Sequence, residues 1–297
     1  MNTPWIWMKF SSRLRRIIGA LAVAAALAGC STIKLGYNNI DEIAFWWLDG
    51  YADFNDDQEA RVREDLQRLH RWHRANELPK FVALLRAMEE AAPADIAPAQ
   101  ACGFFTRVRE RLDVLAGQAE PAVVTLATSL APEQLKNIER KYEKNNSKFR
   151  KDWLALNASE LADKRVEQFT ERSEMVYGPL DDAQLTLLRK QLQSTAFDPQ
   201  RILADRQRRQ RDVLDTLRAV TTQQVSLANA TMSMRGLLDR LREPPVAADR
   251  ARQQAMIDEG CRTFSVLHNS RTAKQRDAAV RRLRAWQRDL QELGGQS

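Results

Sequence analysis

Three histidines and three cysteines are the residues of this 297-residue chain best suited to hold a metal or act as nucleophiles. His70 and His73 lie one helical turn apart, and Glu77 follows four residues on, a spacing that could ligate a metal from one helix face. His73 also continues an apolar stripe that begins at Val62, which favours a histidine in or beside the core. We therefore expect no metal and no cofactor.

Motifs for the common enzyme classes do not occur in the sequence. There is no GxSxG elbow, Walker loop, HExxH pair or Cys/His arrangement, and the low glycine content disfavours loops that cradle phosphate. The chain is therefore expected not to be an enzyme, with a metal-dependent enzyme kept as the second alternative.

The first thirty residues have the pattern of an export signal. Four bases and no acid occur in residues 1–29, and an apolar run extends from Ile17 to Ala28. Twelve residues reach about 18 Å as a helix, well short of the ~30 Å hydrocarbon core of a bilayer. The pattern therefore predicts a cleaved segment rather than a spanning anchor.

This segment ends in Leu27-Ala28-Gly29-Cys30, which resembles the bacterial lipobox. The resemblance implies a diacylglyceryl thioether on Cys30, cleavage before it, and membrane attachment through acyl chains. Ser31 after the cysteine implies forwarding to the outer membrane, so we expect a periplasm-facing lipoprotein of a Gram-negative bacterium. The alternatives are an ordinary signal peptide with a chance cysteine, or a short buried helix.

Export leaves Cys102 and Cys261 as an even pair in an oxidising compartment. A disulfide between them is the favoured interpretation, and two separate buried thiols are the alternative. Neither cysteine belongs to a CxxC pair or lies beside a histidine, which disfavours a metal or catalytic role.

The mature chain is predicted to be all-α, an elongated multi-helix bundle. Alternating β-branched residues are nearly absent, and prolines divide the chain into helix-length pieces. Residues 133–177 lack Gly and Pro, which predicts one long amphipathic helix. The expected division is a signal peptide at 1–29, a lipidated aromatic and acidic arm at 30–55, and a helical domain at 56–297.

One local pattern occurs three times, with an apolar residue first, a Gln fifth, and acids or Pro between them. It predicts helix starts, because a capping side chain and acids in the first turn satisfy the free amide hydrogens there. The three copies are 54–58, 130–134 and 180–184.

The segment from Tyr37 to Glu59 is both aromatic and acidic, with seven acids and no base among residues 41–59. Its aromatic side chains could face a membrane interface, line a ligand or partner site, or pack the arm onto the bundle, and packing is favoured. The acids argue against an anionic lipid surface and favour the basic C-terminal third as an internal partner. The aromatic candidates are Tyr37, Phe45, Trp46, Trp47, Tyr51 and Phe54.

The net charge of +7 first suggests nucleic acid, but four of the bases lie in the predicted signal segment. Arginines cluster at 206–211 and 281–288. Because an exported protein does not meet nucleic acid, the favoured interpretation of these arginines is that they form solvated helix faces. The functional alternatives are an acidic envelope protein, lipopolysaccharide phosphates or peptidoglycan carboxylates.

Two family resemblances follow from short motifs. The run from Cys30 to Asn39 and the segment from Trp46 to Tyr51 resemble a family of uncharacterised Gram-negative outer-membrane lipoproteins, a domain of unknown function. Leu130 with Gln134, and Leu180 with Gln184, resemble the outer positions of the Leu-Thr-x-x-Gln motif of the Spy/CpxP periplasmic chaperones.

These observations together predict a lipid-anchored periplasmic binding or scaffold lipoprotein that performs no catalysis. The first alternative is a chaperone-like holdase, as the second resemblance implies.

Overall fold

The computed structural model describes residues 29–193, 195–222 and 225–295, and these ranges are almost entirely helical. They hold twelve α-helices, one π-helical segment and no strand, so the predicted all-α multi-helix fold is confirmed. The predicted signal peptide, apart from Gly29, lies outside the described residues. The elements are α2 Gly29–Asn38, α3 Ile40–Ala52, α4 Asp56–Asn76, α5 Leu78–Ala91, α6 Pro98–Ser129, α7 Pro132–Phe149, η1 Arg150–Leu154, α8 Ala158–Tyr177, α9 Asp182–Gln193, α10 Pro199–Thr222, α11 Leu227–Arg242, α12 Ala247–Asn269 and α13 Ala273–Gly294.

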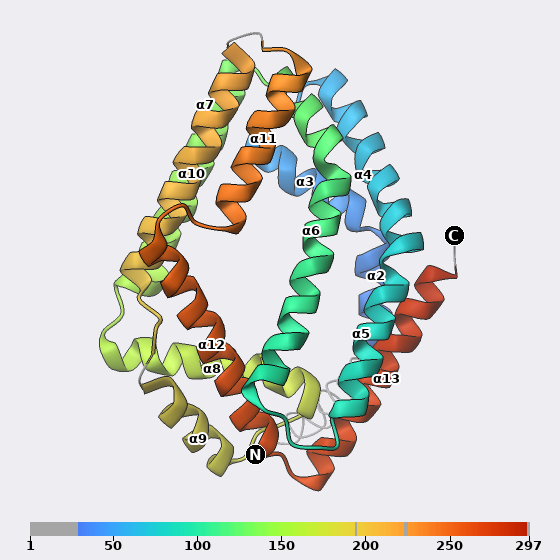
Figure 1. Cartoon of the computed structure of the whole chain (residues 1–297), viewed down its shortest axis with the longest axis vertical. Coiled ribbons are helices and arrows are strands. Elements are labelled where there is room, and N and C mark those ends of the chain that lie inside the picture. The colour runs from blue at the N-terminus through green and yellow to red at the C-terminus, as the bar shows by residue number, and fades with distance from the viewer. Residues whose placement is uncertain (1–28, 194, 223–224, 296–297) are drawn as a thin grey trace, which may run out of the picture.

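The helices are arranged as two sides that meet at both ends of an elongated molecule (Figure 1). On one side α7 and α10 run side by side, and on the other α5 packs against α13. The 32-residue helix α6 links the two sides, since it packs against α4, α10, α11 and α12.

The first two predicted helix starts are confirmed, and they meet in the core. At α4 the Asn55 side chain accepts a hydrogen bond from the backbone N–H of Gln58. At α7 the backbone N–H of Ala131 donates to the Gln134 side chain. The two glutamine side chains also bond each other in both directions, at 3.1 and 2.7 Å. Their amide groups further donate to the carbonyls of Ser129 and Asp53, so each glutamine serves both its own helix start and the junction between two helices.

A second glutamine pair repeats this arrangement in the C-terminal half. The predicted start at α9 is confirmed, since the backbone N–H of Gln184 donates to the Asp181 side chain. Gln184 pairs with Gln275 at 2.8 and 2.9 Å, and Gln275 lies at the third position of α13, where Thr272 is the cap. This fourth start was not predicted, because Arg271 replaces the leading apolar residue.

The prediction of one helix over 133–177 is wrong. Helix α7 ends at Phe149, a π-helical turn follows, and α8 begins at Ala158. The break has a local cause, since Asn157 and Glu160 form a capping box that starts a new helix. Not every proline divides the chain as predicted, because Pro121 lies inside α6.

The largest apolar core lies where α6, α7, α10 and α11 meet, next to the end of α3. Its members include Val124, Leu135, Leu217 and Leu237, each at most 7% exposed. Val124 follows Pro121 by one turn and is buried in this core.

Within the described ranges, no single helix has the length and apolar composition needed to cross a bilayer. Helix α6 passes that test only together with Pro132–Leu154, and the two are bent by 112°.

Candidate functional site: an apolar pocket between α6 and α12

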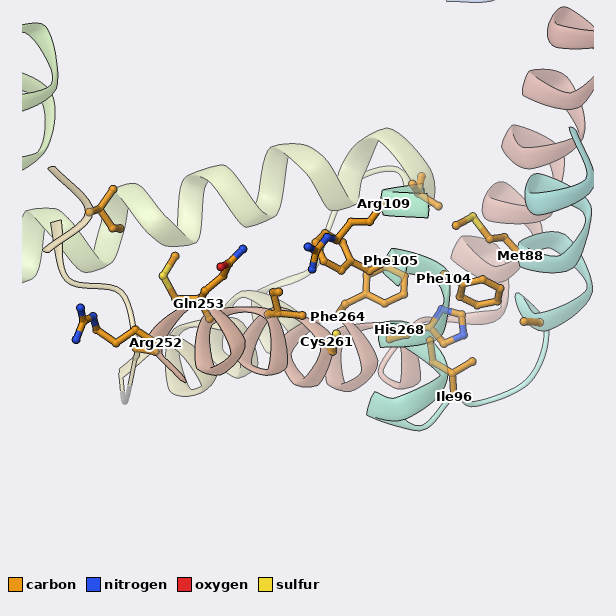
Figure 2. Close-up of a pocket in the computed structure, with 18 of the residues that line it drawn as sticks. Met88, Ile96, Phe104, Phe105, Arg109, Arg252, Gln253, Cys261, Phe264 and His268 are labelled. Atoms are coloured by element: carbon orange, nitrogen blue, oxygen red, sulfur yellow. The ribbon is translucent and has the colours of Figure 1, made fainter. Parts of the chain in front are cut away.

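A cavity of about 720 Å³ opens between α6 and α12, with further wall residues from α5, α8, α10 and α13 (Figure 2). Its volume is within the range of roughly 300–1,000 Å³ found for small-molecule sites. Helices α6 and α12 face each other across it, and a disulfide bond joins the start of α6 to α12.

The lining of this cavity includes aromatic and sulfur-containing side chains. Phe105 of α6 and Phe264 of α12 are 44% and 38% exposed, so their apolar faces are open to solvent in the cavity. The lining also includes the large apolar residues Met88, Phe104, Met256, Ile257 and Trp286.

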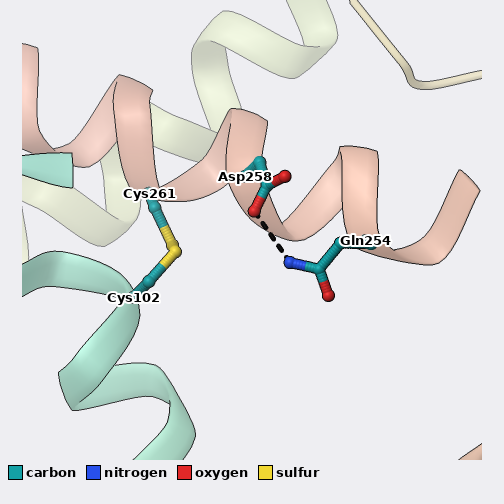
Figure 3. Close-up of a disulfide and its surroundings, with 4 residues drawn as sticks. All are labelled: Cys102, Gln254, Asp258 and Cys261. Atoms are coloured by element: carbon teal, nitrogen blue, oxygen red, sulfur yellow. Dashed lines mark hydrogen bonds between the residues drawn. A yellow bond between two sulfur atoms is a disulfide. The ribbon is translucent and has the colours of Figure 1, made fainter. Parts of the chain in front are cut away.

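The cysteine pair lies at the wall of this cavity. Cys102 of α6 and Cys261 of α12 have their sulfur atoms 2.06 Å apart, the pairing favoured from the sequence (Figure 3). Cys261 itself lines the pocket, and it lies one turn after Asp258, which accepts from Gln254 at 2.8 Å. The disulfide therefore holds the two principal walls together.

Polar contacts at the end of α12 reinforce this junction by holding the α5–α6 connection. Ser265 Oγ donates to the Ile96 carbonyl at 2.6 Å, and Asn269 exchanges hydrogen bonds with the amide and carbonyl of Ile96. Arg271, which is buried, donates to the carbonyls of Ala92, Pro93 and Ala94. The loop over residues 92–97 is thus fixed against the C-terminus of α12.

His268 lines the pocket, but it also takes part in these contacts between the end of α12 and the α5–α6 connection, which we call the clamp. Its ring nitrogens lie 2.7 Å from the Tyr177 hydroxyl and 2.9 Å from the Ala94 carbonyl, so Nε2 donates to Ala94 and Nδ1 accepts from Tyr177. Burial lowers the pKa of His268, and the nearby Arg271 lowers it further. Burial also raises the pKa of Tyr177. Both groups are therefore neutral near pH 7.

A buried ion pair lies behind the pocket wall. Arg165 of α8 donates to Glu259 of α12 at 2.5 Å, and Thr195 and the Ala196 amide also donate to that carboxylate. Burial alone would raise the pKa of Glu259, but these donors outweigh it and the pKa is lowered. The pair fixes α12 against α8, and its charges are compensated.

The histidine spacing found in the sequence does not form a metal-binding group in the structure. The Tyr37 hydroxyl lies 2.8 Å from His73 Nδ1, His70 faces Asp41 at 3.6 Å, and the fully buried Glu77 pairs with Lys80 at 2.7 Å. Across the described ranges there is no group of three or more His, Cys, Asp or Glu placed to hold a metal ion.

Four of the six aromatic candidates pack the arm onto the bundle. Tyr37 bonds His73, and burial raises the pKa of Tyr37 to about 12. Phe45 is 1% exposed and Phe54 packs against the main core, while the Tyr51 hydroxyl accepts from Asn145 at 2.8 Å.

Trp46 and Trp47 differ from these four, being 62% and 63% exposed. They lie on α3 beside the exposed Ile40 and Ile43, and we call these four side chains the α3 face. None of the six aromatic candidates lines the pocket.

The prediction that the acidic segment pairs with the basic C-terminal third is wrong. Glu42 and Glu59 both pair with Arg63 of α4, not with the C-terminal third, and α3 packs against α4 and α7. The contact to the C-terminal helix comes from α2, where Lys34 pairs with Glu292 of α13 at 2.6 Å.

The pocket was missed from the sequence, because its lining residues come from six helices. Only Cys261 among the candidate site residues lines it. The usable signal was the adjacent pair Phe104-Phe105 two residues after Cys102, since the predicted disulfide places that pair opposite α12.

Comparison with protein families matches residues 50–236 to the Family of unknown function (DUF6279). The matched range extends from the end of α3 into α11, so it includes α6 and α10 but not α12. Neither the curated proteins nor the solved structures contained a match.

Proposed function

Because the chain belongs to the Family of unknown function (DUF6279), we propose a function from its own structure: a lipid-anchored, periplasm-facing binding protein of the outer membrane. The proposed ligand is apolar and occupies the pocket between α6 and α12. The pocket is the observation that carries this proposal, since its volume and aromatic lining suit a small molecule.

The polar groups around the pocket favour binding over chemistry. His268 uses both ring nitrogens in the clamp, and Glu259 is compensated by Arg165. Groups engaged in this way hold the walls in place, and they are not free to transfer protons to or from a ligand.

Attachment to the membrane is the second part of the proposal, and it is motivated by Leu27-Ala28-Gly29-Cys30. Helix α2 begins at that point, and α3 follows with two exposed indoles. Tryptophan is enriched at membrane–water interfaces because its ring is apolar and its N–H is polar. We therefore assign the α3 face to the bilayer surface that anchors the protein.

The pocket is tested by filling it. Gly260 of α12 lines the cavity, and a Cβ there would meet nothing within 4 Å. Gly260→Leu should raise the Kd for the neutral dye N-phenylnaphthylamine about tenfold, since its side chain takes up part of the cavity volume. The measurement is dye fluorescence with the mature chain carrying Cys30→Ser, which removes the proposed acyl chains.

Gly117→Leu on the exposed side of α6 is the matched control, because both replacements raise helix propensity by about 1 kcal/mol. Equal dye Kd values for the two variants would rule out the binding function. A chain without either replacement that does not bind the dye would rule it out as well.

The membrane assignment is tested at the anchor and at the α3 face. Cys30→Ala should release the protein from the membrane fraction of cells. With the purified Cys30→Ala chain, phosphatidylcholine vesicles should shift tryptophan emission to the blue, and Trp46→Ser with Trp47→Ser should abolish that shift. Leu112→Ser, at another exposed apolar residue, should leave it unchanged.

The same variants address the chaperone-like holdase, the second candidate, which the exposed apolar α3 face favours. If the unchanged chain slows aggregation of an unfolded client and the tryptophan variants do not, while vesicles cause no emission shift, the α3 face binds proteins rather than lipid.

A further inference from the structure

The four arginines that line the pocket are not equivalent. Three have an aspartate three or four residues earlier in the chain: Asp198 pairs with Arg201 at 3.0 Å, Asp205 with Arg209 at 3.0 Å, and Asp249 with Arg252. Arg109 of α6 has no hydrogen-bond or ion-pair partner among the described residues, although its side chain is partly buried. It is thus the pocket cation whose charge is left uncompensated within the described chain.

Arg109 lies where the apolar lining meets a smaller hollow. Figure 2 shows it extending from α6 toward α12, beside Phe105 and Phe264. The adjoining hollow of about 470 Å³ shares Arg109, Gln253 and Ile257 with the main pocket.

The carboxylates at this end of the pocket are already paired. Glu243 pairs with Arg250 at 3.4 Å, and Asp113 pairs with Arg242 at 2.9 Å. An anion entering here would meet a guanidinium that no carboxylate of the described residues neutralises.

We propose that the pocket binds a single-chain anionic amphiphile, an inference that rests on the proposed binding function. The chain lies against the aromatic lining, and the anionic head pairs with Arg109. A guanidinium offers two parallel N–H donors to a carboxylate or phosphate, and partial burial strengthens that bond by excluding water. A neutral ligand would fill the apolar space but leave Arg109 without a partner.

The experiment measures displacement of N-phenylnaphthylamine from the mature Cys30→Ser chain by three probes below their micelle concentrations. The probes are palmitate, palmitoyl lysophosphatidate and the neutral palmityl alcohol. We expect both anions to displace the dye at lower concentration than the alcohol. Arg109→Gln should weaken the anions about tenfold or more and leave the alcohol unchanged.

Arg107→Gln is the matched control, since it removes an exposed arginine of α6 that does not line the pocket. It should change anion affinity by less than about threefold. The stronger of the two anions identifies the head group as carboxylate or phosphate, and either result with Arg109 dependence supports the proposal.

The two levels of the proposal fail differently. If the dye does not bind, the binding function itself is wrong. If the dye binds and Gly260→Leu blocks it, but the alcohol competes as well as the anions and Arg109→Gln has no effect, only the anionic ligand class is overturned.

Discussion

His268 is kept neutral by its surroundings, and this makes the stability of the fold sensitive to pH. Burial lowers its pKa below the ordinary value of 6.5, and the same cause lowers the pKa of His70 and His73. The unfolded chain therefore binds more protons than the folded chain once the pH falls below that value. Stability is highest above it and declines as the pH falls toward the folded pKa.

We predict that the free energy of unfolding falls between about pH 7.5 and 5.5, with each histidine adding at most about 1.4 kcal/mol per pH unit. His268→Gln should lower stability near neutral pH, because the Tyr177 and Ala94 contacts weaken, but it should make the pH slope shallower. Urea unfolding at several pH values measures both effects. An unchanged slope would show that His268 does not titrate with unfolding.

At the scale of elements, the two glutamine pairs join helix starts that lie far apart in the chain. Gln58 and Gln134 are 76 residues apart, and Gln184 and Gln275 are 91 apart. All four are at most 7% exposed, so each amide group must be satisfied inside the protein. Helix starts and the glutamine pairing between them therefore account for the residue pattern that resembles the periplasmic chaperone motif.

Gln58→Ala and Gln134→Ala should each lower the free energy of unfolding by about 1–3 kcal/mol, because buried donors and acceptors lose partners. Together they should cost less than the sum of the two, with a coupling of about 0.5–3 kcal/mol in a double-mutant cycle. Gln118→Ala, at an exposed position of α6, should change stability by less than about 0.5 kcal/mol. Strict additivity of the two core variants would contradict the pairing.

For the whole molecule, the disulfide ties together halves that are otherwise joined by helix packing and by side-chain bonds. Cys102 and Cys261 are 159 residues apart in sequence, and the bond lies at the wall of the pocket between α6 and α12. A crosslink over so long a loop restricts the unfolded chain strongly.

Cys102→Ala with Cys261→Ala should lower the free energy of unfolding by up to about 5 kcal/mol. It should also weaken dye binding, because the two walls lose their covalent connection. Unfolding in urea with and without reductant measures the first effect, and the double variant should be insensitive to reductant. A midpoint of the unchanged chain that does not move with reductant would argue against the bond.

The features that the sequence alone determined are local. Helix starts at Asn55 and Asp181 follow from capping chemistry within four residues, and the helical class follows from apolar periodicity over a few turns. The sequence also indicates the break before α8, because Asn157 and Glu160 can form a capping box, although no Gly or Pro marks that position. The family of unknown function matches the same helices, from the end of α3 into α11.

Only the tertiary structure decided which of these local features meet. It paired Gln184 with a fourth helix start at Thr272, left Trp46 and Trp47 exposed while burying Phe45, and brought α6 and α12 together around an apolar cavity. It also left Arg109 without an aspartate partner among the described residues, unlike the other three pocket arginines. These outcomes depend on contacts between residues far apart in the chain, where packing and burial decide, whereas capping and periodicity act only within a few turns of helix.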